Sequence, residues 1–298
     1  MPYITNTANS KFRLLISGFP NTGKTTSLPT FIYGPYDCTD QVEEAYKYAD
    51  NKHMVIISCP GETGTRSLPL DTPHITSCCY QADEKDDMNS LEWSAHALDA
   101  FDTISTEVVK NKPDILFLDG LHCLWSHLMN RTTDGEFLSG FDLNWNPTTN
   151  RTDPYRSAKF YNRTHNAFGQ YLAGLYNSSV PFIGATTWEE WESGTAEGMK
   201  AGDIAATRYL WPAIPGGMAK GIVGRFDARV SARLERQCLH RDCIESKNQQ
   251  YHHVWQIYPK NDVQGVGIKG LKITEQIKQK PWVHQSWDKL QMLMQQFS

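Results

Sequence analysis

The sequence predicts an α/β fold built on a mostly parallel sheet flanked by helices, with antiparallel strands added late in the chain. Short apolar runs alternate with longer segments that carry apolar residues every three or four positions. The first run leads directly into a glycine-rich turn, and two apolar runs lie close together after residue 225. Alternating strands and helices of this kind form parallel sheets that are covered by helices on both faces.

The predicted elements follow this apolar pattern from the amino end. Each short apolar run reads as a buried strand, and each longer segment of helical period reads as an amphipathic helix. The predicted strands cover residues 12–17, 54–58, 74–80, 114–119, 180–187, 226–234 and 254–258, and the predicted helices cover residues 90–111 and 156–176.

The composition is that of an ordinary globular chain. Its 298 residues, 40% of them hydrophobic, suffice for one large domain or two small ones. The formal net charge of −4 means that any nucleic-acid contact must come from a local basic groove. The seven scattered cysteines suit a reducing cytoplasm, and no apolar run approaches the ~18 residues of a membrane span. We therefore expect a cytoplasmic protein without a membrane partner.

Two stretches, 130–155 and 189–222, are polar or interrupted by glycine and proline, and we expect long loops there. Loops of this length in a compact domain are usually functional. Both follow strands whose carboxyl ends should meet at the edge of the sheet where ligands bind.

The C-terminal residues 273–298 are predicted to form an amphipathic tail behind a core of residues 1–272. Apolar residues from Trp287 to Phe297 recur at helical spacing. The sequence leaves open whether this helix packs on its own core or on that of a neighbouring subunit.

The glycine-rich turn has the pattern of a phosphate-binding loop, Gly-x4-Gly-Lys-Thr, between a strand and a predicted helix. Gly18 and Gly23 allow backbone N–H groups to approach phosphate oxygens. Lys24 can reach the β- and γ-phosphates, and Thr25 offers a hydroxyl ligand to Mg²⁺. Pro29 should kink or shorten the helix that follows. The predicted nucleotide-binding residues are Gly18, Asn21, Thr22, Gly23, Lys24, Thr25 and Thr26.

Carboxylates and hydroxyls after later strands complete the predicted site for ATP and Mg²⁺. Asp119 ends a buried strand and is the second predicted Mg²⁺ ligand, beside Thr25. Glu62 follows the predicted strand 54–58, the first after the phosphate-binding loop, and is predicted to orient the attacking water. Thr187, with Thr186, is expected to contact the γ-phosphate, and Glu189 lies just beyond them.

The order of these motifs resembles that of RecA-like P-loop ATPases, and most closely that of phage-encoded ATPases of single-strand annealing and recombination. The resemblance covers residues 10–272 and rests on residues 18–26, 57–62, 118–121 and 182–187, with further similar segments at 211–218, 224–230 and 254–260. It implies an ATP-hydrolysing homo-oligomer, a ring or a filament, that acts on single-stranded DNA in the cytoplasm of a phage host.

The same resemblance implies roles for basic and aromatic side chains outside the phosphate loop. The two long loops would line the DNA path, where cationic groups neutralise phosphates and aromatic rings stack on bases. A lysine or arginine from a neighbouring subunit would complete the ATP site. The DNA-contact candidates are Arg131, Arg151, Arg156, Lys200, Arg208 and Lys220, with Trp145 or Trp191 for stacking, and the trans-acting candidates are Arg225, Arg229 and Lys260.

Three alternatives remain open on the sequence. The chain could be a viral DNA-packaging ATPase, although no cluster of acidic metal ligands suggests an attached nuclease. It could be a nucleotide-gated switch whose loops bind a protein rather than DNA. Cys238, Cys243, His252 and His253 could hold zinc, but their spacing is loose and a hairpin loop is the preferred interpretation.

Overall fold

The computed structural model describes most of the chain. The described residues are 11–33, 52–68, 74–79, 90–132, 145–146, 151–152, 154–194, 207–214, 218–235, 252–259 and 266–296. Within these ranges, ten strands form one sheet and two short strands form a separate hairpin.

The main sheet is parallel at its centre and antiparallel toward one side. Its order is β12-β10-β9-β1-β7-β4-β2-β3, with β11 added to β9 and β8 to β7. From β9 to β3 the neighbouring strands are parallel, whereas β10, β11, β12 and β8 pair antiparallel. The strands are β1 (Phe12–Gly18), β2 (Met54–Ser58), β3 (Ile75–Cys79), β4 (Ile115–Asp119), β7 (Phe182–Gly194), β8 (Thr207–Pro212), β9 (Ala228–Glu235), β10 (His252–Gln256), β11 (Gly267–Ile268) and β12 (Trp282–His284).

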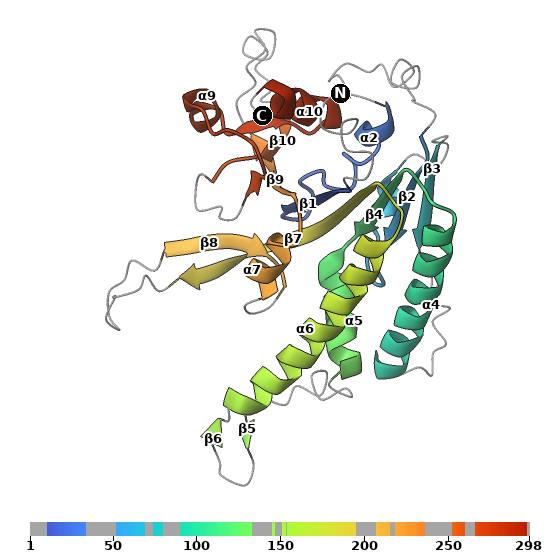
Figure 1. The fold of residues 1–298 in the computed structure, drawn as a ribbon. Coiled ribbons are helices and arrows are strands. Elements are labelled where there is room, and N and C mark those ends of the chain that lie inside the picture. Colours follow the sequence, from blue (N-terminus) through green and yellow to red (C-terminus); the bar gives the residue numbers. More distant parts are fainter. Residues whose placement is uncertain are drawn as a thin grey trace.

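Helices cover both faces of this sheet (Figure 1). On one face, Leu15, Ile57 and Leu116 pack with Phe101 and Phe168 from the long helices, because alternate residues of each strand point to the same side. That face is covered by α4 (Ser90–Lys110), α5 (Leu121–Thr132) and α6 (Pro154–Asn177), and the shorter helices are α2 (Thr30–Tyr33), η2 (Gly64–Ser67), α7 (Met218–Val223), α9 (Glu275–Gln279) and α10 (Trp287–Gln296). The predicted mostly parallel α/β sheet with late antiparallel strands is confirmed.

The opposite face shows that the C-terminal tail belongs to the core. Trp287 and Leu290 of α10 are buried in the same cluster as Leu14, Phe31 and Phe117. The Trp287 and Phe31 rings stack at 4.9 Å, and β12 pairs with β10. The tail therefore packs on its own chain, and the predicted boundary at residue 272 does not separate two structural units.

The structure describes only parts of the two predicted long loops, and most of the described residues there belong to regular elements. The first stretch begins inside α5, which continues the chain from β4, and contains the hairpin of β5 (Trp145–Asn146) and β6 (Arg151–Thr152). This hairpin lies at the outer end of α6, away from the sheet (Figure 1). In the second stretch, β7 runs on to Gly194 and pairs with β8, so Thr187 lies within a strand and does not end one.

Candidate functional site

The phosphate-binding loop leaves the carboxyl end of β1 at the centre of the sheet. A Cβ on Gly18 would lie 2.8 Å from the carbonyl oxygen of Ala232, so only glycine fits between β1 and β9. Gly23 has φ of 84° and Asn21 has φ of 62°, both in the left-handed region. The loop therefore has the tight turn that its sequence pattern requires.

The helix predicted after the loop is interrupted near Pro29, as the sequence led us to expect. Ser27 N donates to Gly23 O, which closes one helical turn, but the next bonds span three residues, as from Leu28 N to Thr25 O. Among the described residues that follow the loop, regular α-helix begins only at α2, after Pro29. Proline removes one donor and clashes with the preceding turn, so the segment before Pro29 forms a single α-helical turn.

Lys24 folds back over its own loop. Its Nζ donates to the carbonyl oxygens of Gly18 at 3.1 Å and Phe19 at 2.8 Å, and the side chain is buried. Burial lowers the pKa of Lys24, although the carboxylates of Asp119, Glu62 and Glu189 act in the opposite direction. A cation in this position is ready for anionic oxygens at the loop.

Thr25 and Asp119 come together although they belong to distant motifs. Thr25 Oγ1 donates to Asp119 Oδ2 at 3.0 Å. Thr186 Oγ1 donates to Asp119 Oδ1 and accepts from Gly120 N at 2.9 Å. Burial raises the pKa of Asp119 to about 6, and the hydrogen bond from Thr186 opposes that rise. The predicted pair of Mg²⁺ ligands is thus brought to one point by β1 and β4, with β7 between them.

Glu62 lies in the loop after β2, beside this pair. Its Oε1 accepts hydrogen bonds from the backbone N–H groups of Thr63 and Gly64, each at 3.0 Å. A Cβ on Gly64 would lie 2.6 Å from Thr25 Oγ1, so the backbone of the Glu62 loop touches the phosphate-loop threonine. The predicted water-orienting carboxylate is therefore at the site, with its orientation fixed by two backbone donors.

Thr186 and Thr187, the two threonines predicted to contact the γ-phosphate, have different surroundings on β7. Thr186 contacts Asp119, whereas Thr187 is on the opposite face of β7, because successive strand residues alternate. The Thr187 hydroxyl is buried and has no hydrogen-bond partner among the described residues. Thr186 is therefore the threonine that contacts the Asp119 carboxylate, and the γ-phosphate contact of Thr187 stays a prediction.

Glu189 belongs to a buried network of ion pairs and hydrogen bonds. Its carboxylate accepts from Ser17 Oγ at 2.6 Å and from Arg229 Nη2 at 3.0 Å, and Arg233 forms a second ion pair with it. The Arg229 side chain is 1% exposed. An arginine buried inside its own chain cannot reach a neighbouring active site, so the prediction of Arg229 as a trans-acting residue is wrong.

Arg233 is a residue near the loop that the sequence interpretation missed. Its guanidinium lies over the Phe19 ring of the phosphate loop, 5.5 Å from the ring centroid. Its Nη1 is buried and has no hydrogen-bond partner among the described residues. The parallel pairing of β9 with β1 aligns Gly18 with Ala232, so the next residue, Arg233, lies beside the phosphate loop. The local sequence carries no signal for this long-range pairing.

The C-terminal strands also contact the phosphate loop. Gln285 Nε2 donates to the carbonyl oxygen of Thr22 at 2.8 Å, and His253 Nδ1 lies 3.1 Å from the same oxygen. A Cβ on Gly23 would collide with both side chains, at 2.6 Å. His253, which the sequence grouped with a possible zinc site, instead packs against the loop backbone.

The sequence interpretation also missed His122 and Cys123, the second and third residues of α5, which starts directly after Gly120. The His122 ring stacks on Trp188, with ring centroids 4.2 Å apart. Burial lowers the pKa of His122 to about 4, and the charge of Lys24 adds to this shift. Burial raises the pKa of Cys123 to about 12, and the charges of Glu62 and Asp119 act in the same direction.

Of the remaining predicted partner residues, the two whose side chains the structure describes, Arg131 and Arg225, lie away from this site. Arg131 lies at the far end of α5, about 15 Å along the helix from Leu121, and pairs with Asp99 at 3.6 Å. Arg225 Nη1 donates to Gly169 O on α6. Lys200, Lys260, Cys238 and Cys243 lie outside the described residues, and so do the side chains of Arg151, Arg156, Arg208, Lys220, His252, Trp145 and Trp191.

Comparisons with known proteins show similarity only at the level of solved structures. No protein-family model and no curated protein matches the sequence. The ATPase EscN of the type III secretion system of enteropathogenic E. coli, in complex with its central stalk EscO, aligns with a TM-score of 0.38 and 12% identity over 85% of this chain and 48% of EscN. The chain thus spans about half the length of EscN.

A second solved structure comes from an archaeon. The flagellar accessory protein FlaH from Methanocaldococcus jannaschii aligns with a TM-score of 0.36 and 11% identity, over 89% of this chain and 85% of that protein. Similarity at these scores assigns no function to the chain.

None of the described helices combines the length and apolar character that crossing a bilayer requires.

Proposed function

We propose that the chain binds ATP together with Mg²⁺ and hydrolyses it. The observation that carries this proposal is the hydrogen bond between Thr25 and Asp119, which are 94 residues apart in the sequence. A phosphate loop alone indicates phosphate binding, whereas a buried carboxylate beside its threonine adds the group that positions the metal in phosphate-transferring enzymes.

The residues present fit a magnesium ion. Hard oxygen donors are the ligands that Mg²⁺ prefers, and the Thr25 hydroxyl and the Asp119 carboxylate offer two of them at one point. Thr186 fixes the orientation of Asp119. When bound, the ion would neutralise charge on the terminal phosphates.

The side chains around this pair divide the remaining tasks. Lys24 would exchange its hydrogen bonds to the loop carbonyls for bonds to phosphate oxygens. Nη1 of Arg233, which has no hydrogen-bond partner among the described residues, would contribute a second cationic donor. Glu62 would orient the attacking water through the carboxylate oxygen that is not bound to the backbone. Glu189, paired with two arginines, is not available for that role.

Phosphate release from ATP tests this proposal. The wild type should release phosphate only when Mg²⁺ is added, and Asp119→Asn should abolish the release. The matched control is Asp114→Asn, because Asp114 precedes the same strand at its exposed opposite end. Equal rates for wild type and Asp119→Asn, or a rate that chelation leaves unchanged, would contradict the proposal.

We further propose that the ATPase is a homo-oligomer that acts on single-stranded DNA in phage-type recombination or annealing. The support is the order of motifs that the chain shares with such ATPases. Filter binding of labelled single-stranded DNA tests it, since binding through phosphates falls steeply with salt. Binding at low salt that ATP strengthens is expected. Absence of binding at low salt would overturn the DNA proposal and favour a nucleotide-gated switch for a protein partner.

A further inference from the structure

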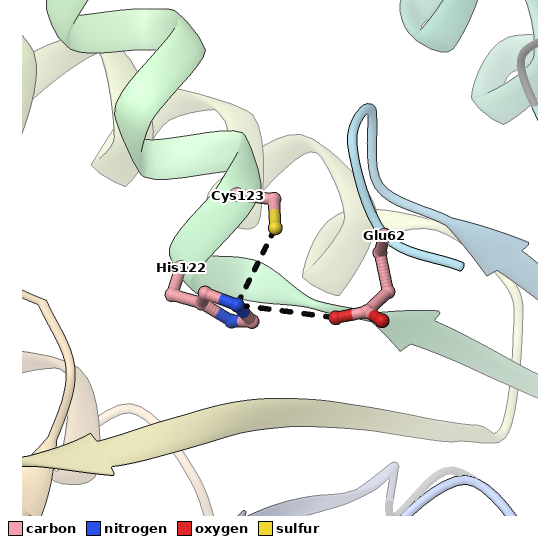
Figure 2. Close-up of side chains that lie close together, drawn as sticks. All are labelled: Glu62, His122 and Cys123. Carbon is pink, nitrogen blue, oxygen red and sulfur yellow. Dashed lines mark hydrogen bonds and ion pairs between the residues drawn. The ribbon is translucent and has the colours of Figure 1, made fainter. Parts of the chain in front are cut away.

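Three side chains with metal-binding atoms converge beside the proposed Mg²⁺ site but do not belong to it. Cys123 Sγ lies 3.4 Å from His122 Nε2, which lies 3.9 Å from Glu62 Oε2. One ligand atom from each residue lies within 4.8 Å of the other two. Figure 2 shows the imidazole of His122 between the thiol and the carboxylate.

Each of these donors is already held in place. Glu62 uses Oε1 for two backbone N–H groups, which leaves Oε2 directed toward His122. His122 is fixed by its stacking on Trp188. Cys123 is anchored at the start of α5, where its N–H donates to Gly120 O at 2.9 Å. Ordered ligands lose little conformational freedom when an ion binds.

The geometry matches the requirements of one small ion. With metal–nitrogen and metal–oxygen bonds of about 2.0 Å and a metal–sulfur bond of about 2.3 Å, a tetrahedral zinc ion places nitrogen about 3.3 Å from oxygen and about 3.5 Å from sulfur. The sulfur–nitrogen separation of 3.4 Å matches this geometry, and the nitrogen–oxygen separation of 3.9 Å is about 0.6 Å longer. Only small side-chain movements are needed to bring this pair and the third pair into the tetrahedral geometry.

We propose that Glu62, His122 and Cys123 form a binding site for one thiophilic divalent cation of the Zn²⁺ class. Sulfur and imidazole nitrogen select such ions over Mg²⁺ and Ca²⁺, which prefer oxygen. Binding would replace the thiol proton, so the cysteine would bind as thiolate and one proton would be released to solvent. The fourth position of the ion would be open to water.

The site has a regulatory consequence that rests on the proposed ATPase function. An ion bound to Glu62 Oε2 would occupy the carboxylate oxygen that is proposed to orient the attacking water. Zinc should therefore slow ATP turnover, and a chelator should restore it. Added zinc should leave the ATP turnover of Cys123→Ser unchanged, or reduce it much less than that of the wild type.

Cobalt titration without nucleotide tests the site independently of ATP hydrolysis. Co²⁺ replaces Zn²⁺ and gives a thiolate-to-cobalt absorption band only when a cysteine binds it. One equivalent should produce this band in the wild type, and Cys123→Ser should lack it. His122→Ala should bind Co²⁺ more weakly by a factor of about ten to a hundred or more, the range found when a supporting group of a metal site is removed.

Matched controls separate this site from other thiols and imidazoles. Cys78→Ser changes a half-buried cysteine on β3, and His96→Ala changes an exposed histidine on α4. The double variant Cys238→Ser/Cys243→Ser removes the other thiol pair that the sequence singled out. All three should retain the band, and circular dichroism should show that every variant is folded.

Two results would overturn the proposal. One is a folded wild type without the band at stoichiometric Co²⁺. The other is a band that survives in Cys123→Ser or disappears in the double variant. A protein that shows the band but does not hydrolyse ATP would keep the metal site and refute only the ATPase proposal.

Discussion

The Lys24 ammonium donates a hydrogen bond to the carbonyl oxygen of Gly18, 3.1 Å away, so the phosphate loop closes on its own lysine. A second bond to Phe19 O holds the ammonium at the base of the loop. A phosphate oxygen carries negative charge, so it attracts the ammonium more strongly than a neutral carbonyl oxygen does. A triphosphate can therefore replace the two carbonyl oxygens as the hydrogen-bond partner of Lys24.

Glu62→Gln should retain ATP binding and slow hydrolysis by a factor of about 10² or more, the contribution that a positioned acid or base usually makes. The amide keeps the shape of the side chain but cannot accept a proton. Single-turnover phosphate release, with binding measured separately, checks this prediction. Glu190→Gln is the control, because Glu190 is exposed on β7. Normal turnover in Glu62→Gln would show that another carboxylate orients the water.

Arg233→Ala should weaken the binding of ATP more than the binding of ADP. The buried Nη1 beside Phe19 lacks a partner among the described residues, and a bond between a charged donor and a terminal phosphate contributes about 1.5–3 kcal/mol. The expected loss is therefore about tenfold to a hundredfold in ATP affinity. Competition binding of the two nucleotides measures it.

Two further variants make the Arg233 test specific. Arg233→Lys keeps the positive charge beside Glu189, and Arg225→Ala removes an arginine that donates to α6. The first should show a smaller loss than Arg233→Ala, and the second should show none. If Arg233→Ala lost affinity for ATP and ADP equally, the role of this residue would be structural alone.

Gly184→Ala should destabilise the fold by about 1–3 kcal/mol, the usual cost of overpacking. A Cβ at this position of β7 would lie 2.0 Å from Cε1 of Phe117 on the neighbouring strand β4. Gly174→Ala on α6 is the control, because its Cβ would meet nothing within 4 Å and alanine favours helix. Urea unfolding of both variants checks the pair. Equal midpoints would mean that Phe117 does not pack over Gly184.

The local patterns predicted the central elements well because buried strands and amphipathic helices carry their period in the sequence. The strand that leads into the phosphate loop, the strand that ends at Asp119 and the helix predicted at residues 90–111 are examples. Thr25 and Asp119 could be paired from the sequence because two motifs of known spacing imply their contact.

The missed features depend on contacts between distant segments. Arg233 reaches the loop only because β9 pairs with β1, and Gln285 reaches it only because β12 joins the sheet through β10. The polar residues beyond Thr187 read as a loop, but they form a strand because β8 pairs with them. Strand propensity depends on the neighbouring strand as well as on the residues themselves.

Calorimetric titration of the folded protein with Mg·ATP tests the central claim most directly. We predict saturable binding by the wild type and no binding heat for Lys24→Ala, with Lys110→Ala on the distal end of α4 as the unaffected control. A folded wild type that gives no heat at millimolar Mg·ATP, or a Lys24→Ala variant that binds as well as the wild type, would contradict the claim.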